Sequence, residues 1–319
     1  MTAFKGPAVL ASPIAEEVRE GLNAHPKRLP PKLFYDAEGS RLFEQITETP
    51  EYYPTRTERG ILEQYAPAIV AEAGANLTLV EMGAGSASKT RVLITALLRR
   101  QLGLAFYPVD VSSSALREAV SSLNGDFRGL HVSPIVADYS RHIPQLQALP
   151  GRKLVLFIGS TIGNFEPEEA RDFLKRLRRS LAPGDALLLG FDMRKDPATL
   201  HAAYNDRQGV TARFNKNLLA RINRELGGQF DLSSFDHLAF WNDKKSRIEM
   251  HLKSAVDQTV WIQDLEHFFY FSSGECLHTE NSYKFSAATI ASLLRRTGLR
   301  LEKTWTDPKD WFSVVLARV

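Results

Sequence analysis

Short apolar runs alternate with helical stretches over the middle of the chain, from residue 77 to residue 192. Two parallel strands must be joined by a crossover connection, so this alternation predicts a parallel α/β sheet. The expected strands are residues 77–82, 104–110, 130–138, 153–158 and 186–190, and the expected helices between them include residues 113–123 and 168–181.

The chain on either side of this region follows other patterns. Residues 1–54 predict helices and loops, and the capping-box pattern Thr55-x-x-Glu58 predicts the start of a longer helix. Residues 197–226 are expected to be helical, whereas apolar and polar positions alternate over residues 235–271 and predict an antiparallel sheet. A helix over residues 287–296 and strands over residues 299–305 and 312–318 are expected to close the chain.

Composition and charge serve mainly to exclude classes of protein. The 319 residues carry a net charge of +3, which gives little reason to expect nucleic-acid binding. No apolar run is long enough to suggest a membrane helix, and residues 1–19 do not resemble a signal peptide. The only cysteine, Cys276, fits a reducing compartment, so we expect a cytoplasmic protein, which we also expect to be monomeric. The eight histidines lack paired ligand spacing, so no metal is expected.

The first predicted strand ends in a glycine-rich turn, Glu81-Met-Gly83-Ala-Gly85, that opens a helix. Glycines let a backbone approach a ligand closely. An NAD fingerprint would place a third glycine or an alanine at position 88, whereas this chain has Ser88 there. Asp110, at the end of the second strand, can accept hydrogen bonds from a ribose, which NAD and S-adenosylmethionine both contain.

The residues around this turn favour S-adenosylmethionine, and an NAD oxidoreductase is the alternative. Glu81 directly precedes the glycines, and Asp138 and Tyr139 follow the third strand, where Rossmann-like methyltransferases hold the adenine amine. A carboxylate-lined pocket suits a sulfonium cation better than a pyrophosphate. Glu81 and Asp138 could instead be helix caps or ion-pair partners.

The end of the chain fits the same interpretation, because a parallel sheet that finishes with a hairpin is usual for Rossmann-like class I methyltransferases. The expected fold class is therefore α/β with such a sheet. Residues 58–194 and 284–319 are expected to form the cofactor-binding domain. Residues 1–57 and 195–283 are expected to form a second, α+β domain over the carboxyl edge of the sheet, where ligands bind in such folds.

Longer strings carry a more specific signal. They are Leu33-Phe-Tyr-Asp-Ala-Glu-Gly-Ser, Glu51-Tyr-Tyr-Pro-Thr-Arg-Thr-Glu, Gly159-Ser-Thr-Ile-Gly-Asn164-Phe, Ala203-Tyr204-Asn-Asp, Arg247-Ile-Glu-Met250 and Thr279-Glu280-Asn-Ser282-Tyr-Lys-Phe. Together they resemble the histidine-specific Nα-methyltransferases of ergothioneine biosynthesis, over about residues 30–319.

The resemblance implies roles for individual residues. Asn164 and Tyr204 would hold the α-carboxylate of the substrate, while Glu280 and Ser282 would bind its imidazole. The other residues implied to line the substrate pocket are Tyr53, Gly159 and Met250, and those implied to bind the cofactor are Tyr35, Glu81, Gly83, Gly85, Lys89, Asp110, Asp138 and Tyr139.

The resemblance also implies an activity: trimethylation of the α-amino group of L-histidine to give hercynine, the first step of ergothioneine biosynthesis. We expect positioning of the reactants, rather than a general base, to supply the catalysis, so no catalytic residue is assigned. A related branch methylates tryptophan derivatives, but Glu280 and Ser282 can both hydrogen-bond an imidazole and therefore favour histidine. A cofactor sensor without turnover is a third interpretation, which the substrate-side residues disfavour.

Overall fold

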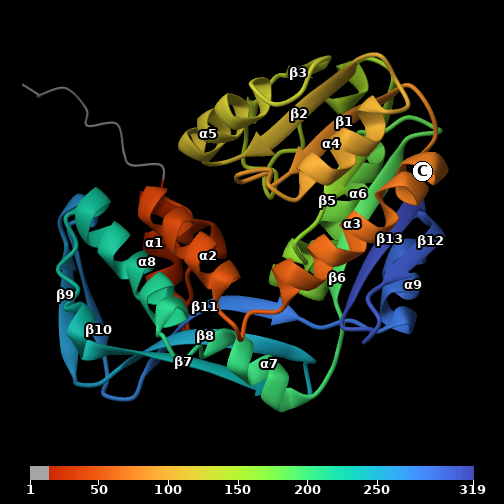
Figure 1. Ribbon diagram of the computed structural model, residues 1–319. Helices are drawn as coiled ribbons and strands as arrows, with labels where there is room; N and C mark the ends of the chain where they lie inside the picture. The colour runs from red at the N-terminus through yellow and green to blue at the C-terminus, as the bar shows by residue number, and fades with distance from the viewer. Residues whose placement is uncertain (1–13) are drawn as a thin grey trace, which may run out of the picture.

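The structure is a computed structural model that describes residues 14–319 (Figure 1). Residues 1–13, with which the predicted substrate domain begins, lie outside the described residues. Most of residues 1–19, which are not expected to be a signal peptide, therefore also lie outside them. None of the helices in residues 14–319 has the length and apolar character that crossing a lipid bilayer requires.

The larger sheet has eight strands, in the order β12-β13-β6-β5-β1-β2-β3, with β4 paired to β2. The first six strands in the sequence are parallel, whereas β13 pairs antiparallel with both β6 and β12. The strand bounds are β1 (Leu77–Met82), β2 (Leu104–Asp110), β3 (Leu130–Val132), β4 (Ile135–Val136), β5 (Arg152–Phe157), β6 (Ala186–Asp192), β12 (Arg300–Thr306) and β13 (Phe312–Arg318).

Helices cover both faces of this sheet because its strands are apolar on both faces. On β5, Leu154 and Leu156 point into one core, and Val155 and Phe157 point into the other, as strand alternation requires. The first core is closed by α3 (Pro54–Ala73), α4 (Thr90–Leu98) and α5 (Ser113–Asn124), and the second by α6 (Pro167–Arg179) and α9 (Ala287–Arg296).

A third core joins the N-terminal helices to the insert that follows β6. Its largest sheet runs β11-β8-β7, and β9 and β10 form a separate antiparallel pair. The elements are α1 (Ala15–Asn23), α2 (Ala37–Glu48), α7 (Pro197–Tyr204), α8 (Val210–Leu226), β7 (Phe235–Asn242), β8 (Arg247–Ser254), β9 (Gln258–Ile262), β10 (His267–Phe271) and β11 (Cys276–Tyr283). Single-turn helices are η1 (Pro31–Phe34), η2 (Leu146–Ala148), η3 (Thr161–Asn164), η4 (Leu232–Ser234) and η5 (Gln263–Leu265).

The separation of this third core from the other two supports the division expected from the sequence. We propose on this basis that residues 58–194 and 284–319 form one domain and that residues 14–57 and 195–283 form the other. In Figure 1 the insert and the N-terminal helices lie together on one side of the larger sheet.

Two details of the sequence-based prediction are wrong. The expected capping box does not form: Tyr53 is the N-cap of α3 without a side-chain cap, because Pro54 starts the helix and Glu58 is buried in other contacts. The single strand expected over residues 130–138 is split into β3 and β4, since Pro134, between them, has no backbone N–H to continue the ladder.

Candidate active site

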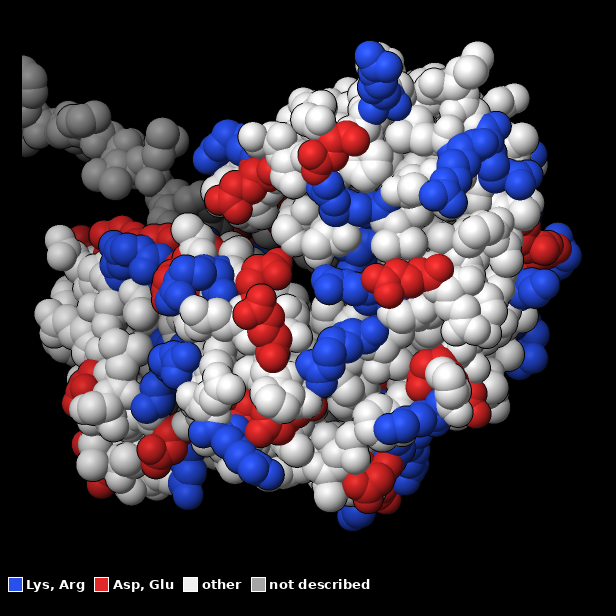
Figure 2. All heavy atoms as spheres, in the orientation of Figure 1, with Lys and Arg blue, Asp and Glu red and all other residues white. Residues whose placement is uncertain are grey.

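A deep cleft lies between the larger sheet and the elements of the third core. Its volume is about 1830 Å³, well above the usual range of roughly 300–1,000 Å³ for one small ligand. The carboxyl ends of β1, β2, β4, β5 and β6 all contribute to its wall, as expected for a parallel sheet. Figure 2 shows the molecule hollowed between its two halves, with acidic and basic side chains intermixed on this face. The cleft can hold two ligands side by side.

The glycine-rich turn after β1 forms one wall of the cleft. Gly83 has φ +72°, and a Cβ there would lie 3.0 Å from the hydroxyl of Tyr139, so a larger side chain would meet both strain and crowding. One carboxylate oxygen of Asp110 accepts a hydrogen bond from the N–H of Gly85 at 3.0 Å, and the other accepts from the N–H of Ser112 at 2.9 Å. Asp110 therefore fixes the turn from the neighbouring strand.

Glu81 is a buried carboxyl group beside this turn. Burial raises its pKa to about 8, because the ionised form has lost its water. The Thr90 hydroxyl and the positive charge of Lys89 partly offset this rise in pKa. Since the charged form of a buried carboxyl group is costly, the position is suited to a ligand that brings a positive charge.

Lys89 and Gly159 meet at a second buried carboxylate, that of Glu58. The Glu58 side chain forms an ion pair with Lys89 and accepts hydrogen bonds from the N–H of Gly159 at 2.8 and 3.0 Å. Glu58 thus ties α3 to the turn after β5, and Lys89 lines the cleft with a neutralised charge.

Asp138 lines the cleft and is already paired. Its carboxylate accepts hydrogen bonds from Lys32 at 2.6 Å and from the Ser140 N–H at 3.0 Å. Burial raises the pKa of Asp138, but these bonds outweigh it and hold the pKa below its usual value. The neighbouring Tyr139 ring packs against Phe157 at 5.8 Å between ring centres. Asp138 therefore forms an ion pair, which was its alternative role, and it also lines the cleft.

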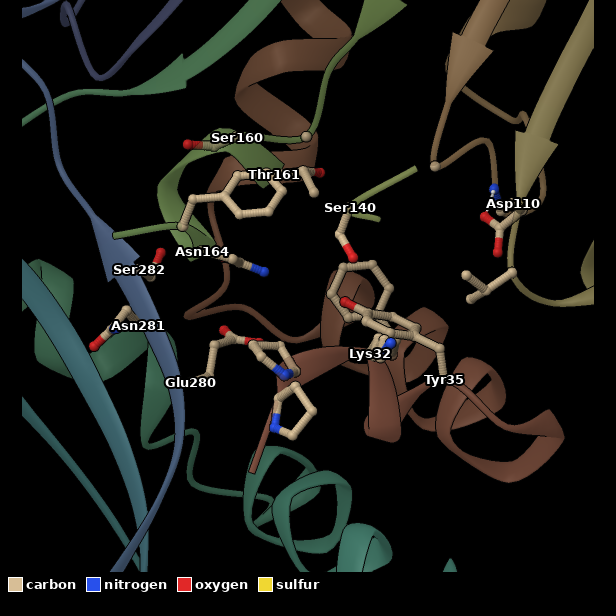
Figure 3. A pocket seen from close by; sticks show the side chains of 18 of the residues that line it. Lys32, Tyr35, Asp110, Ser140, Ser160, Thr161, Asn164, Glu280, Asn281 and Ser282 are labelled. Atoms are coloured by element: carbon tan, nitrogen blue, oxygen red, sulfur yellow. Dashed lines mark hydrogen bonds between the residues drawn. The ribbon is translucent and has the colours of Figure 1, made fainter. Parts of the chain in front are cut away.

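The opposite wall is formed by β11. Glu280 and Ser282 are two residues apart and therefore share one face of the strand, while Met250 lies opposite Glu280 on β8. Burial raises the pKa of Glu280 to about 7, although the positive charge of Lys284 works in the other direction. In Figure 3, Glu280 and Asn164 both point into the central space, and Asp110 lies beyond Tyr35 at the end of β2.

A hydrogen-bonded cluster lies behind this wall. The Tyr204 hydroxyl donates to Ser282 Oγ at 2.6 Å, and Lys284 Nζ donates to both of these oxygens. Lys284 also forms an ion pair of 2.7 Å with Asp192, the last residue of β6. Asp192 in turn accepts a hydrogen bond from Lys195 at 2.5 Å. The cluster connects the end of the larger sheet to the predicted substrate side chains.

The three tyrosines of the N-terminal segment have different positions. Tyr35 and Tyr52 line the cleft, and the Tyr52 ring packs edge-on against Tyr204 at 6.3 Å. Tyr53 does not line it: its ring packs on Trp311, and its hydroxyl donates to Asp192 at 2.8 Å. Of the predicted site residues, the structure therefore brings all but Tyr53 to the wall of one cleft.

Sequence reasoning passed over four polar or aromatic residues at this site: Tyr52, Glu58, Asp192 and Lys284. The signal for Lys284 was present, because Glu280, Ser282 and Lys284 follow the two-residue period of one strand face. Asp192 lies two residues after the predicted strand 186–190, at the ligand-binding edge, so its position was also informative. Glu58 could not be found this way, since its partners Lys89 and Gly159 are distant in sequence.

Comparison with known proteins decides which family this cleft belongs to. Residues 14–319 match the family model described as "Histidine-specific methyltransferase, SAM-dependent". The chain belongs to this family. Its S-adenosylmethionine dependence agrees with the interpretation of the glycine-rich turn, and an NAD oxidoreductase is excluded as the class of this protein.

Individual relatives agree with the family model. The chain is 45% identical to a histidine N-alpha-methyltransferase of Mycolicibacterium smegmatis, over 96% of this chain and 95% of that protein. It is 28% identical to ergothioneine biosynthesis protein 1 of Schizosaccharomyces pombe, over 91% of this chain but only 39% of that protein. A 4-dimethylallyltryptophan N-methyltransferase of Claviceps purpurea is 29% identical, over 92% of this chain and 91% of that protein.

Proposed function

We propose that this protein is the L-histidine Nα-methyltransferase that trimethylates the α-amino group of L-histidine to hercynine, the first step of ergothioneine biosynthesis. The observation that carries the proposal is the placement of Asn164, Tyr204, Glu280 and Ser282 around one cleft that also contains the glycine-rich turn. The tryptophan alternative is less favoured, because the relative with the higher identity and the family model are both named for histidine.

On the cofactor side, the residues fit S-adenosylmethionine. Asp110 offers a carboxylate at the end of β2 for ribose hydroxyls, and Gly83 and Gly85 let the backbone approach the ligand. The buried carboxyl group of Glu81 suits the positive charge of this cofactor. When bound, the cofactor supplies an electrophilic methyl group to the substrate amine. Lys89, Tyr35, Asp138 and Tyr139 complete this proposed half of the cleft.

On the substrate side, the residues act by holding the amino acid. Asn164 would donate a hydrogen bond to the carboxylate, and Tyr204, whose own hydroxyl hydrogen goes to Ser282, would line the pocket beside it. Glu280 would accept a hydrogen bond from one ring nitrogen, and Ser282 would serve the other. Gly159 and Met250 would shape the remaining wall. Holding both reactants near attack distance can remove up to about 7–11 kcal/mol from the barrier.

The direct test is incubation of the protein with S-adenosylmethionine and a mixture of free amino acids. Mass spectrometry should show L-histidine gaining one, two and then three methyl groups, all on the α-nitrogen. Tryptophan in the same mixture serves as the control for selectivity. If histidine stays unmodified while another amino acid is methylated, the histidine assignment fails.

The raised pKa of Glu81 predicts that a proton is released when the cofactor binds. Its pKa of about 8 leaves it largely protonated at pH 7, and a cation bound nearby would favour the ionised form. Binding of S-adenosylmethionine at pH 7 should therefore release close to one proton, and the affinity should rise as the pH approaches 8. Calorimetry in two buffers of different ionisation enthalpy measures this release.

The matched variant is Glu81→Gln, which keeps the shape of the side chain and cannot titrate. It should bind the cofactor with less proton release than the wild type, so the comparison also removes the contribution of the cofactor's own amine. Equal release from both proteins would show that Glu81 does not sense the ligand.

The proposal also includes a cytoplasmic, monomeric enzyme that acts on a free small molecule. The single Cys276 supports a reducing compartment, in which no disulfide is needed. Light scattering on the purified protein would determine the oligomeric state.

A further inference from the structure

Lys284 is a buried cation that touches two of the proposed substrate-binding hydroxyl groups. It follows β11 directly, and its side chain is 0% exposed. Its ammonium group has three partners: Asp192 at 2.7 Å, Ser282 Oγ at 2.8 Å and the Tyr204 hydroxyl at 3.0 Å. These three bonds use all the hydrogens that an ammonium group has.

The ammonium group determines how the two hydroxyl groups can use their hydrogens. Lys284 can only donate, so the oxygens of Tyr204 and Ser282 both accept from it. Tyr204 also donates to Ser282 Oγ at 2.6 Å, which gives that oxygen two incoming hydrogen bonds. A hydroxyl oxygen accepts about two such bonds, so Ser282 is left with its own hydrogen to offer.

Ser282 therefore faces the cleft as a donor rather than as an acceptor. Two residues away on the same strand face, Glu280 can accept a hydrogen bond. A neutral imidazole has one N–H and one bare nitrogen, so an acceptor beside a donor matches both atoms of its edge.

We propose that Lys284 is a positioning and specificity residue, which turns Ser282 into a hydrogen-bond donor for the bare ring nitrogen of the substrate. The proposal rests on the proposed function, because it assumes that histidine binds between Glu280 and Ser282. Lys284 does not touch the substrate and acts through Ser282 and Tyr204.

The structure offers a matched control in Lys195. Its side chain is 5% exposed, and it forms an ion pair of 2.5 Å with the same Asp192, but its other partners are the hydroxyl of Tyr53 and the carbonyl of Met193. Lys284→Met and Lys195→Met each remove one ammonium group from Asp192 and leave it the other. Only the first change frees Ser282 and Tyr204.

The experiment measures selectivity between two ligands, which would not change if Lys284 had only a structural role. Dissociation constants are measured by calorimetry, with S-adenosylhomocysteine present, for L-histidine and for β-(2-thienyl)-L-alanine. The thienyl ring has a similar size but neither an N–H nor a bare nitrogen. The wild type should prefer histidine, and Lys284→Met should reduce this preference about tenfold, the effect of losing one oriented hydrogen bond. Lys195→Met should keep the wild-type preference.

Each outcome decides the proposal. An unchanged preference in folded Lys284→Met, or an equal reduction in Lys195→Met, overturns it. If Lys284→Met does not fold, Ser282→Ala replaces it, since it removes the proposed donor and leaves Lys284 paired with Asp192 and Tyr204, and an unchanged preference there also overturns the proposal. A wild type that shows no preference for histidine would instead contradict the proposed function, so the two failures are distinguishable.

Discussion

Replacing Glu280 by alanine should lower kcat/KM for histidine about 100-fold, because an imidazole N–H would then be buried without an acceptor. Glu280 is buried and lies in the cleft wall. Its carboxylate accepts no hydrogen bond from another residue in the part of the chain that the structure describes. The affinity for S-adenosylmethionine should stay at the wild-type value, since the glycine-rich turn lies on the opposite wall. Steady-state kinetics and cofactor calorimetry measure the two quantities.

Two further variants control for this result. Glu280→Gln keeps an acceptor oxygen and should lose less activity than the alanine variant. Glu275→Ala removes a carboxylate that precedes the same strand but pairs with Lys27 outside the cleft wall, and it should keep its kinetics. Equal activity of wild type and Glu280→Ala would mean that the ring is bound elsewhere.

The second large effect is expected for Asp110→Ala, which should weaken S-adenosylmethionine binding about 100-fold. Its carboxylate is proposed to accept ribose hydroxyls, each charge-assisted bond contributing about 1.5–3 kcal/mol at most. It also holds the N–H groups of Gly85 and Ser112, so its loss loosens the turn itself. Calorimetric titration with S-adenosylmethionine gives the change in dissociation constant.

Asp126→Ala is the matched control, because Asp126 is a surface carboxylate paired with Arg91 and does not line the cleft. It should bind the cofactor as the wild type does. A parallel titration with NAD should give no binding for any of the three proteins. A folded Asp110→Ala protein with unchanged cofactor affinity would remove Asp110 from the site.

Local patterns were sufficient for most of the fold. The period-two alternation over residues 235–271 and the apolar runs of the sheet correctly indicated their strands, because burial on one or both faces imposes those patterns directly. The capping-box prediction failed because a tertiary contact overrode the local pattern. Thr55-x-x-Glu58 has the spacing of a capping box, yet Glu58 is turned inward to Lys89 and Gly159.

The sequence alone determined the family, the sheet and its ligand-binding edge, since strand ends and glycine turns are encoded by neighbouring residues. Only the tertiary structure decided which of two adjacent tyrosines faces the cleft, because Tyr52 and Tyr53 are equivalent in any local pattern. Tyr53 turns away to reach Asp192, 139 positions later in the chain. The cluster of Asp192, Lys195 and Lys284 likewise exists only after folding, since buried charges must find partners in space rather than in sequence.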